Sequence, residues 1–203
     1  IKHAVVIGAS MAGIKVVEVL HKYGIETWLL DLASYIFPLA AYKEVAKEIE
    51  KRVEAQGVHL MFGVTIDHME QENGEKTAVL TDGSRIPADI VGLCIGTRAI
   101  TETVQGEVEI GRGIVVDDHM RTSVPGIYAA GDCCEGNNLE SGQNQIIGLW
   151  ANANHQGETA GINMAGGDMA YKGNILHNIT HFMNMDFIGF GDNRMQGEVL
   201  EYG

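Results

Sequence analysis

A glycine-rich run near the start of the chain has the residue types and spacing of a phosphate-binding turn. It spans residues 8–13, reads GASMAG, and lies between the β-branched segment 3–7 and a stretch whose apolar residues recur at helical spacing. The first glycine allows a tight turn, the last lets the helix pack close to the strand, and N–H groups at the helix start can hold a pyrophosphate. The residues predicted here to bind a cofactor are Gly8, Ala9, Ser10, Met11 and Gly13.

The middle position of this run departs from the usual pattern, because it holds Ser10 in place of a glycine. The serine adds a Cβ atom where the phosphate comes closest, so we expect the affinity for a pyrophosphate to be weakened but not abolished. A βαβ turn in an α/β protein that binds no nucleotide has the same pattern. The run alone therefore leaves both interpretations open.

An aspartate follows at the distance that a dinucleotide site requires. Asp31 ends a second apolar segment, 27–30, and lies 18 residues after Gly13. A carboxylate there can accept hydrogen bonds from the adenosine ribose hydroxyls, and no Lys or Arg lies between Leu32 and Tyr42 to neutralise a 2′-phosphate. The sequence therefore predicts NADH in preference to NADPH, with a helix or loop cap as the alternative role of Asp31.

The rest of the first hundred residues completes an α/β pattern. Glu, Lys and Ala dominate 41–56, which predicts a helix, and Gly57 stands where a helix C-cap is expected. Three short segments separated by Asn-Gly and Asp-Gly dipeptides predict an antiparallel meander. The predicted strands are 3–7, 27–30 and 58–62, the meander segments 64–69, 76–80 and 84–87, and the returning strand 89–95, which Gly96 bounds.

The second half of the chain has shorter units. Two brief strands are predicted within 107–117, and a small-residue strand, 126–132, ends in the carboxylate of Asp132. Helical spacing recurs over 145–165. The last segment, 171–203, has apolar clusters without a complete unit.

Charge and hydropathy limit the classes of partner. The chain has 14 Lys and Arg against 27 Asp and Glu, a net charge of −13, so nucleic acid and anionic membrane surfaces would be repelled. No apolar run reaches the roughly 18 residues that a membrane-spanning helix needs. We therefore expect neither nucleic acid nor a membrane as partner.

The cysteines and histidines indicate structural rather than metal-binding roles. Three cysteines are too few for a disulfide scaffold and indicate a reducing compartment, the cytoplasm. Cys133 and Cys134 are adjacent, so a strained vicinal disulfide is the alternative to two structural thiols. His177 and His181 have the spacing of a helical metal pair, but no third ligand accompanies them in helical register, and we predict no metal.

One segment is far more specific than the glycine-rich run. Residues 121–132 read RTSVPGIYAAGD, and with GIVVD at 113–117 and the glycine-rich run they resemble the FAD-dependent pyridine nucleotide-disulfide oxidoreductase family. The helical segment 145–165 is similar to the branch that includes NADH oxidases, nitrite reductases and rubredoxin or ferredoxin reductases. The cofactor-binding residues that the resemblance adds are Gly96, Gly131 and Asp132, whose carboxylate would hold the ribitol chain of FAD.

Two departures from the family pattern bear on function. Family members usually open with a separate FAD-binding βαβ unit, whereas this chain begins at Ile1 and enters the NAD-like pattern at once, so we expect a fragment of a longer protein. The other departure is Lys15, where family members commonly have Glu near the nicotinamide. Lys15 calls the geometry of hydride transfer into question.

The sequence thus predicts an α/β fold: a Rossmann-like βαβ NAD-binding domain with an antiparallel β-meander, plus the second half of an FAD-binding domain. The predicted domains are 1–99 for NAD(H), 100–166 for the half FAD domain, and 167–203 for the start of a truncated interface domain. The parent would be an FAD-dependent NADH oxidoreductase that passes hydride from NADH to FAD and on to an unidentified electron acceptor. We expect the fragment to bind FAD poorly and to form a homo-oligomer through uncovered strand edges.

Two rival interpretations come from other classes of protein. The chain could be a dinucleotide-binding module without turnover, because Lys15 replaces the usual acid. It could also be an interaction domain that uses the same scaffold and binds no nucleotide, since a fold alone does not determine function.

Overall fold

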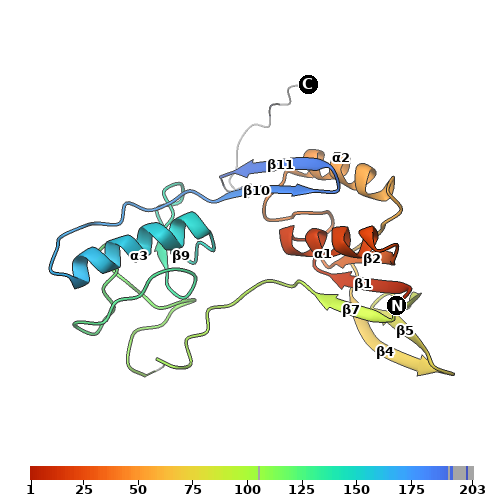
Figure 1. Cartoon of the computed structure of the whole chain (residues 1–203), viewed down its shortest axis with the longest axis horizontal. Coiled ribbons are helices and arrows are strands. Elements are labelled where there is room, and N and C mark those ends of the chain that lie inside the picture. The colour runs from red at the N-terminus through yellow and green to blue at the C-terminus, as the bar shows by residue number, and fades with distance from the viewer. Residues whose placement is uncertain (105, 192, 194–199, 201–203) are drawn as a thin grey trace. The chain divides into compact units, whose positions relative to one another are not determined.

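The computed structural model describes residues 1–104, 106–191, 193 and 200 (Figure 1). The chain divides into two compact units, of which unit 1 comprises Ile1–Gly96 with Asn178–Gly203 and unit 2 comprises Thr97–His177. Unit 1 is therefore built from two stretches that are far apart in the sequence. Among the described residues, no helix has the length and apolar character needed to cross a membrane.

Unit 1 is built on a parallel sheet of four strands in the order β3-β2-β1-β7. The central strand β1 pairs with β2 on one side and with β7 on the other, and every pair is parallel. Helix α1 connects β1 with β2 and helix α2 connects β2 with β3, whereas β7 follows the antiparallel meander in the chain. The bounds are β1 His3–Ile7, α1 Met11–Lys22, β2 Glu26–Asp31, α2 Lys43–Glu54, β3 His59–Phe62 and β7 Ile90–Leu93.

Different elements bury the two faces of this sheet (Figure 1). On one face, Val6 and Leu29 pack with Val17 of α1 in a core that also includes α2. On the other face, Val5 and Leu30 pack against an antiparallel sheet in the order β4-β5-β6. Successive residues of a strand point to opposite faces, so both faces of β1 and β2 are apolar. The bounds of the meander are β4 Ile66–Glu72, β5 Glu75–Leu80 and β6 Arg85–Pro87.

A hairpin from the C-terminal part of the chain completes the core of unit 1. It consists of β10, His177–Phe182, and β11, Met185–Phe190. The turn residues Met183 and Asn184 have φ of 46° and 62°, the left-handed conformation of a tight hairpin turn. The side chains of the hairpin that join the core of α1 and α2 are Phe182, Met183, Met185 and Phe187.

A carboxylate of α1 holds this hairpin at its turn. Glu18 is only 8% exposed, and its Oε1 accepts a hydrogen bond from the Met183 N–H at 2.9 Å. Its Oε2 accepts from Lys15 Nζ at 2.6 Å, and the same ammonium group donates to the His181 carbonyl oxygen. The hydrogen bond from Lys15 lowers the pKa of Glu18 below its usual range and the Met183 N–H acts in the same direction, whereas burial opposes both.

Unit 2 has one long helix and little other regular structure. Helix α3 spans Trp150–Met164, and the short strands β8, Gly136–Asn137, and β9, Asn144–Gln145, pair antiparallel. The core of unit 2 gathers Ile114, Val116, Met120, Ala129, Cys134, Ala160 and Tyr171 with Val108. Loops supply most of these side chains, so packing rather than a sheet holds the unit together.

The predicted α/β class, the parallel sheet and the meander are confirmed. Helix α3 begins at Trp150, five residues after its predicted start, because Asn144 and Gln145 pair as β9. The strands predicted within 107–117 and at 126–132 are wrong. In the described part of the chain both segments form only isolated bridges. A regular strand needs a continuous ladder of hydrogen bonds to a neighbouring strand, and these segments do not form one.

The tail also differs from expectation, because it forms the β10–β11 hairpin. His177 and His181 therefore lie on a strand, where an i, i+4 pair does not have the geometry of a helical metal pair. The domain boundaries expected at 99 and 166 stay predictions.

We expect the Glu18→Gln variant to lose stability at neutral pH and to lose less of it in acid. A carboxylate with a lowered native pKa stabilises the fold above its unfolded pKa of about 4.3, and this stabilisation disappears as the pH falls through the native value. The variant should be about 1–3 kcal/mol less stable at pH 7, with a difference that shrinks below pH ~4. Urea unfolding followed by Trp28 fluorescence in a Trp150→Phe background measures this difference for unit 1.

The Glu54→Gln variant is the control, because Glu54 is exposed at the end of α2. It should change the unfolding midpoint little at either pH. A Glu18→Gln penalty that stays constant from pH 7 to pH 3 would contradict the role assigned to the Glu18 carboxylate.

Candidate functional site

The glycine-rich turn lies where β1 ends and α1 begins, at the carboxyl edge of the parallel sheet. Gly8 has a φ of +105°, and a Cβ atom added to it would lie 2.2 Å from the Cys94 carbonyl oxygen. A Cβ atom at Gly13 would lie 1.8 Å from the Gly8 carbonyl oxygen. Both positions therefore require glycine, and the structure brings the two predicted glycines into one tight turn.

Ser10 has a local role that the sequence analysis did not foresee, because it is the N-cap of α1. Its hydroxyl oxygen accepts from the Gly13 N–H at 3.3 Å and the hydroxyl lies 3.3 Å from the Cys94 carbonyl oxygen, to which it donates. The Ser10 hydroxyl thus accepts from the Gly13 N–H, one of the groups that a phosphate could otherwise use. The N–H groups of Met11 and Ala12 have no acceptor within the described residues, as is usual at a helix start. They leave an anion site at this terminus.

Asp31 stands at the end of β2, beside this turn. Its Oδ2 accepts from the Ala9 N–H at 2.7 Å and its Oδ1 accepts from the Ala33 N–H at 2.8 Å. The loop-capping role that the sequence left open is therefore present. Each carboxylate oxygen can accept a second hydrogen bond, so the same group can also receive ribose hydroxyls.

Lys15 lies one turn into α1 and is not a free cation. Its ammonium group is bound by Glu18 and by the His181 carbonyl oxygen, as described above. Glu18 was not among the predicted residues, although its i, i+3 spacing from Lys15 was a usable signal. The expected effect of Lys15 on hydride transfer stays a prediction.

The remaining predicted residue of unit 1, Gly96, is exposed at the end of the unit with a φ of +104°. In unit 2, Asp132 is exposed beside the start of α3, because a Cβ atom added at Gly148 would lie 3.7 Å from its Oδ2. The α3 N-cap, Leu149, offers no side-chain cap, so the first N–H groups of the helix are available to a ligand. A carboxylate and a helix start thus adjoin in unit 2.

A buried polar side chain fixes the turn before Asp132. Gln156 of α3 is fully buried, and its Oε1 accepts from the Gly131 N–H at 2.8 Å. Gly131 has a φ of +85°, which favours glycine there. Gln156 was not among the residues predicted from the sequence, although a polar residue among the helically spaced apolar ones of 145–165 was an available signal.

The cysteines of unit 2 are free thiols. Burial raises the pKa of Cys134 to about 12, so this group stays a protonated thiol near neutral pH. Burial likewise raises the pKa of Tyr171 to about 12. The structure therefore favours the structural role of the thiols over the vicinal disulfide.

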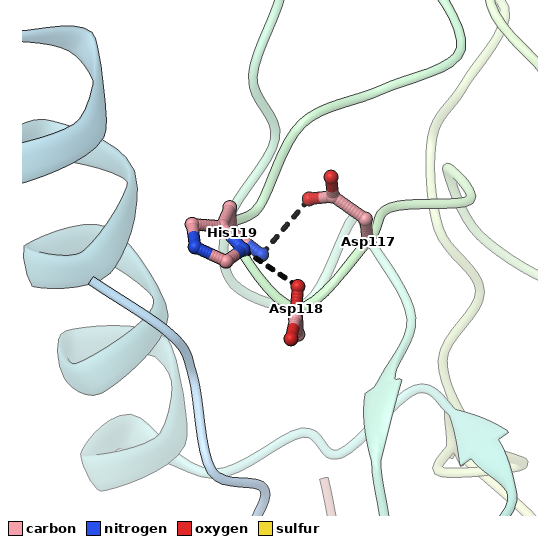
Figure 2. Close-up of side chains that lie close together, drawn as sticks. All are labelled: Asp117, Asp118 and His119. Carbon is pink, nitrogen blue, oxygen red and sulfur yellow. Dashed lines mark hydrogen bonds and ion pairs between the residues drawn. The ribbon is translucent and has the colours of Figure 1, made fainter. Parts of the chain in front are cut away.

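Figure 2 shows a cluster of Asp117, Asp118 and His119 on a turn of unit 2. Asp117 Oδ1 accepts from the His119 N–H at 2.9 Å, and Asp118 Oδ1 lies 2.6 Å from His119 Nδ1. The hydrogen bond that the His119 ring donates to the Asp118 carboxylate raises the pKa of His119, burial opposes this rise, and the contact of Nε2 with Asp168 adds to it. The side-chain oxygens and nitrogens already bond within the protein, so we assign no metal to them.

Comparison with known proteins decides the family. The profile described as pyridine nucleotide-disulphide oxidoreductase matches residues 2–157. The chain belongs to this family. The family resemblance seen in the sequence is thus confirmed, and the family is one of flavoproteins that use NAD(P)H.

Three relatives place the chain within the family. An NADH oxidase of Enterococcus faecalis is 31% identical over 175 residues, which is 85% of this chain and 39% of that protein. The structure of a water-forming NADH oxidase from Lactobacillus brevis, bound to NADH, has a TM-score of 0.88 at 27% identity and matches 94% of this chain and 43% of that one. An engineered variant of the same oxidase, bound to NADPH, has a TM-score of 0.86 at 26% identity, over 92% of this chain and 42% of that one. The chain spans about two fifths of the length of these relatives.

Replacing Gly8 with alanine should destabilise unit 1 severely. A left-handed φ alone costs a non-glycine residue about 1–2 kcal/mol, and the clash with the Cys94 carbonyl oxygen adds overpacking of roughly 1–3 kcal/mol. Gly57→Ala is the matched control, because Gly57 has a φ of +90° and open space around its Cβ position. Urea unfolding of both variants should give the larger loss for Gly8→Ala, and equal losses would show that the close approach at Gly8 is unimportant.

Proposed function

We propose that this chain is the NADH-binding part of a flavin-dependent oxidoreductase that passes hydride from NADH to FAD and on to an electron acceptor. The observation that carries the proposal is the joint placement of the glycine turn, the open N–H groups of Met11 and Ala12, and the carboxylate of Asp31. Pyrophosphate on the helix start and ribose on the carboxylate would hold the adenosine half of NADH. The cofactor-binding residues proposed in unit 1 are Gly8, Ala9, Ser10, Met11, Gly13, Asp31 and Gly96.

The second cofactor would be held in unit 2. Asp132 and the uncapped start of α3 fit the hydroxyl-rich chain and the ring edge of a flavin, since a carboxylate accepts strong hydrogen bonds from hydroxyls. When bound, NADH supplies the hydride and FAD accepts it, while the protein binds the cofactors, orients them and excludes water. Gln156, through Gly131, would keep Asp132 in place.

Domain roles and partners follow as further parts of the proposal. We assign 1–99 to NADH binding, 100–166 to the second half of an FAD-binding domain and 167–203 to the start of an interface domain. The electron acceptor would contact parts of the protein outside this chain. The free cysteines support a reducing compartment such as the cytoplasm, and a homo-oligomer would cover the strand edges.

A dinucleotide-binding module without turnover is the second candidate, and Lys15 favours it. The ammonium group is committed to Glu18 and the hairpin, whereas the family pattern has an acid at this position. In a protein that also carries an FAD-binding unit, stopped-flow reduction of the flavin by NADH separates the candidates. Hydride transfer bleaches the flavin absorbance, and a module that only binds leaves it unchanged.

The engineered relative supports NADH over NADPH. Two of its five replaced residues are a glycine and an aspartate eighteen positions apart, as Gly13 and Asp31 are here. A replaced proline follows that aspartate by seven positions, as Pro38 follows Asp31. The NADPH-using variant has lost the aspartate and has gained arginine at the next position and at the proline. The corresponding residues here are Asp31, Leu32 and Pro38. Like the NADH-using parent, this chain has a carboxylate at the first of these positions and uncharged residues at the other two.

We expect calorimetric titration to give tighter binding of NADH than of NADPH, by about 1–3 kcal/mol, the scale of a charged hydrogen bond gained or lost. Asp31→Ala should narrow the gap. A variant that combines Asp31→Ala, Leu32→Arg, Ala33→Ser and Pro38→Arg should prefer NADPH. Asp67→Ala on β4 is the control, because it removes the same charge away from the turn. Tighter binding of NADPH by the unaltered chain would overturn the proposed specificity.

We expect the 203-residue chain to purify with little flavin and to bind added FAD weakly, because the resemblance places the ADP half of FAD on an upstream unit. Asp132→Asn should weaken that binding about tenfold or more, the effect of a lost charged hydrogen bond of about 1.5–3 kcal/mol. Quenching of FAD fluorescence measures the affinity, with Asp118→Asn as the control. A monomer that purifies with stoichiometric flavin would contradict the expectation that this chain lacks part of the FAD site.

A further inference from the structure

The loop between β2 and α2 folds back onto the glycine turn through one residue. The Phe37 N–H donates to the Ala9 carbonyl oxygen at 2.9 Å, and the Ala9 N–H in turn donates to Asp31 Oδ2 at 2.7 Å. Phe37 is 1% exposed and has a φ of +56°, which is rare for a bulky side chain. Such a conformation persists only where the surroundings hold it.

The surroundings that hold Phe37 come from the C-terminal hairpin. The Phe182 ring stands edge-on to the Phe37 ring, with centroids 5.4 Å apart and an interplanar angle of 87°. The Phe187 ring lies 5.3 Å away at 51°. Edge-on and tilted aromatic pairs at these distances are favourable. Two rings from β10 and β11 thus pack against one ring of the β2–α2 loop.

Further contacts from the same stretch hold the loop after Phe37. Asn193 Nδ2 donates to the Pro38 carbonyl oxygen at 3.2 Å and to the Ala41 carbonyl oxygen at 2.8 Å. A Cβ atom at Gly189 would lie 2.8 Å from the Ala40 carbonyl oxygen, so β11 approaches the loop backbone closely. The hairpin and Asn193 therefore contact the loop at Phe37, Pro38, Ala40 and Ala41.

We propose that the β10–β11 hairpin positions the adenosine-ribose end of the dinucleotide site, with Phe37 as the positioning residue. This inference rests on the proposed NADH site. The rings of Phe182 and Phe187 keep Phe37 in its left-handed conformation, and its N–H then holds Ala9. The Ala9 N–H in turn donates to Asp31, so the hairpin fixes the position of the ribose-binding carboxylate through Phe37 and Ala9.

The consequence of removing a ring follows from this chain of contacts. Without Phe187, Phe37 can relax toward a common backbone conformation and withdraw its N–H from Ala9. The turn and the carboxylate then keep only their mutual hydrogen bond and lose the anchor to the loop, so NADH must restrict their motion on binding. The hairpin contributes no proposed ligand-binding residue, so its loss removes no contact with NADH. The free-energy cost of ordering the loop on binding instead lowers the affinity for NADH.

The test compares Phe187→Ala with Phe190→Ala in the full chain. Both change a phenylalanine of β11, but Phe187 is 7% exposed and faces the loop, whereas Phe190 is 70% exposed on the other face. We expect Phe187→Ala to raise the NADH dissociation constant five- to twentyfold at a temperature where the protein is folded, and Phe190→Ala to change it less than twofold. Phe187→Leu should recover at least half of the loss.

Amide hydrogen exchange gives a readout that does not depend on NADH. The amides of Phe37 and Ala9 should exchange at least tenfold faster in Phe187→Ala, while those of the β4-β5-β6 sheet keep their rates. A purely structural role would accelerate exchange throughout unit 1. If the unaltered chain does not bind NADH but Phe187→Ala still exchanges faster at Phe37 and Ala9, the proposed function is overturned, while the contact of the hairpin with the loop is supported. Unchanged exchange at Phe37 in Phe187→Ala would overturn the inference.

A second variant covers the case in which Phe187→Ala does not fold. Asn193→Ala removes the two hydrogen bonds that its Nδ2 donates to the loop backbone. It should raise the NADH dissociation constant at least threefold and speed exchange at Ala41. Unchanged affinity in a folded Asn193→Ala protein that binds NADH would count against the inference.

Discussion

The close approach of α1 to the end of β1 is the constraint on which unit 1 depends. The two chain segments meet at Gly13 and Gly8 with no room for a Cβ atom between them. This contact aims the start of α1 along the carboxyl edge of the sheet, where the N–H groups of Met11 and Ala12 are open. It also brings the Ala9 N–H to Asp31 at the end of the next strand. One packing contact thereby places the open start of a helix and a carboxylate at the same edge of the sheet.

Several features were predictable from the sequence because each follows from local residue types. The glycine run required a turn between a strand and a helix, and the Asn-Gly and Asp-Gly dipeptides required hairpins. Asp31 could be placed because a parallel neighbour of β1 must end at the same edge of the sheet. The specific string at 121–132 revealed the family although it forms only a loop with one bridge here. Family motifs are sets of side chains, and they are recognisable without regular backbone structure.

The features that escaped prediction depend on contacts between distant parts of the chain. Nothing near Glu18 in the sequence announces that its carboxylate receives the Met183 N–H, which lies 165 positions away. The segment that forms β10 and β11 shows only apolar clusters in the sequence. Its inner face packs against α2 and Phe37, which are distant in the sequence, so local residue types do not reveal the hairpin. The strands expected at 107–117 and 126–132 failed for the converse reason, because apolar alternation says nothing about whether a neighbouring strand is present.

The return of the hairpin to unit 1 also orders the events of synthesis. Residues 94–176, which number 83, separate the end of β7 from the start of the hairpin, and at roughly 5–20 residues per second the ribosome needs about 4–17 s to add them. During that interval the parallel sheet can already form, but Phe37 has no aromatic partners and Glu18 has no backbone amide to receive. Closing a loop of this length costs conformational entropy that grows only slowly with its size. A nascent chain therefore holds an unfinished unit 1 with apolar surface exposed, a state on which a chaperone could act.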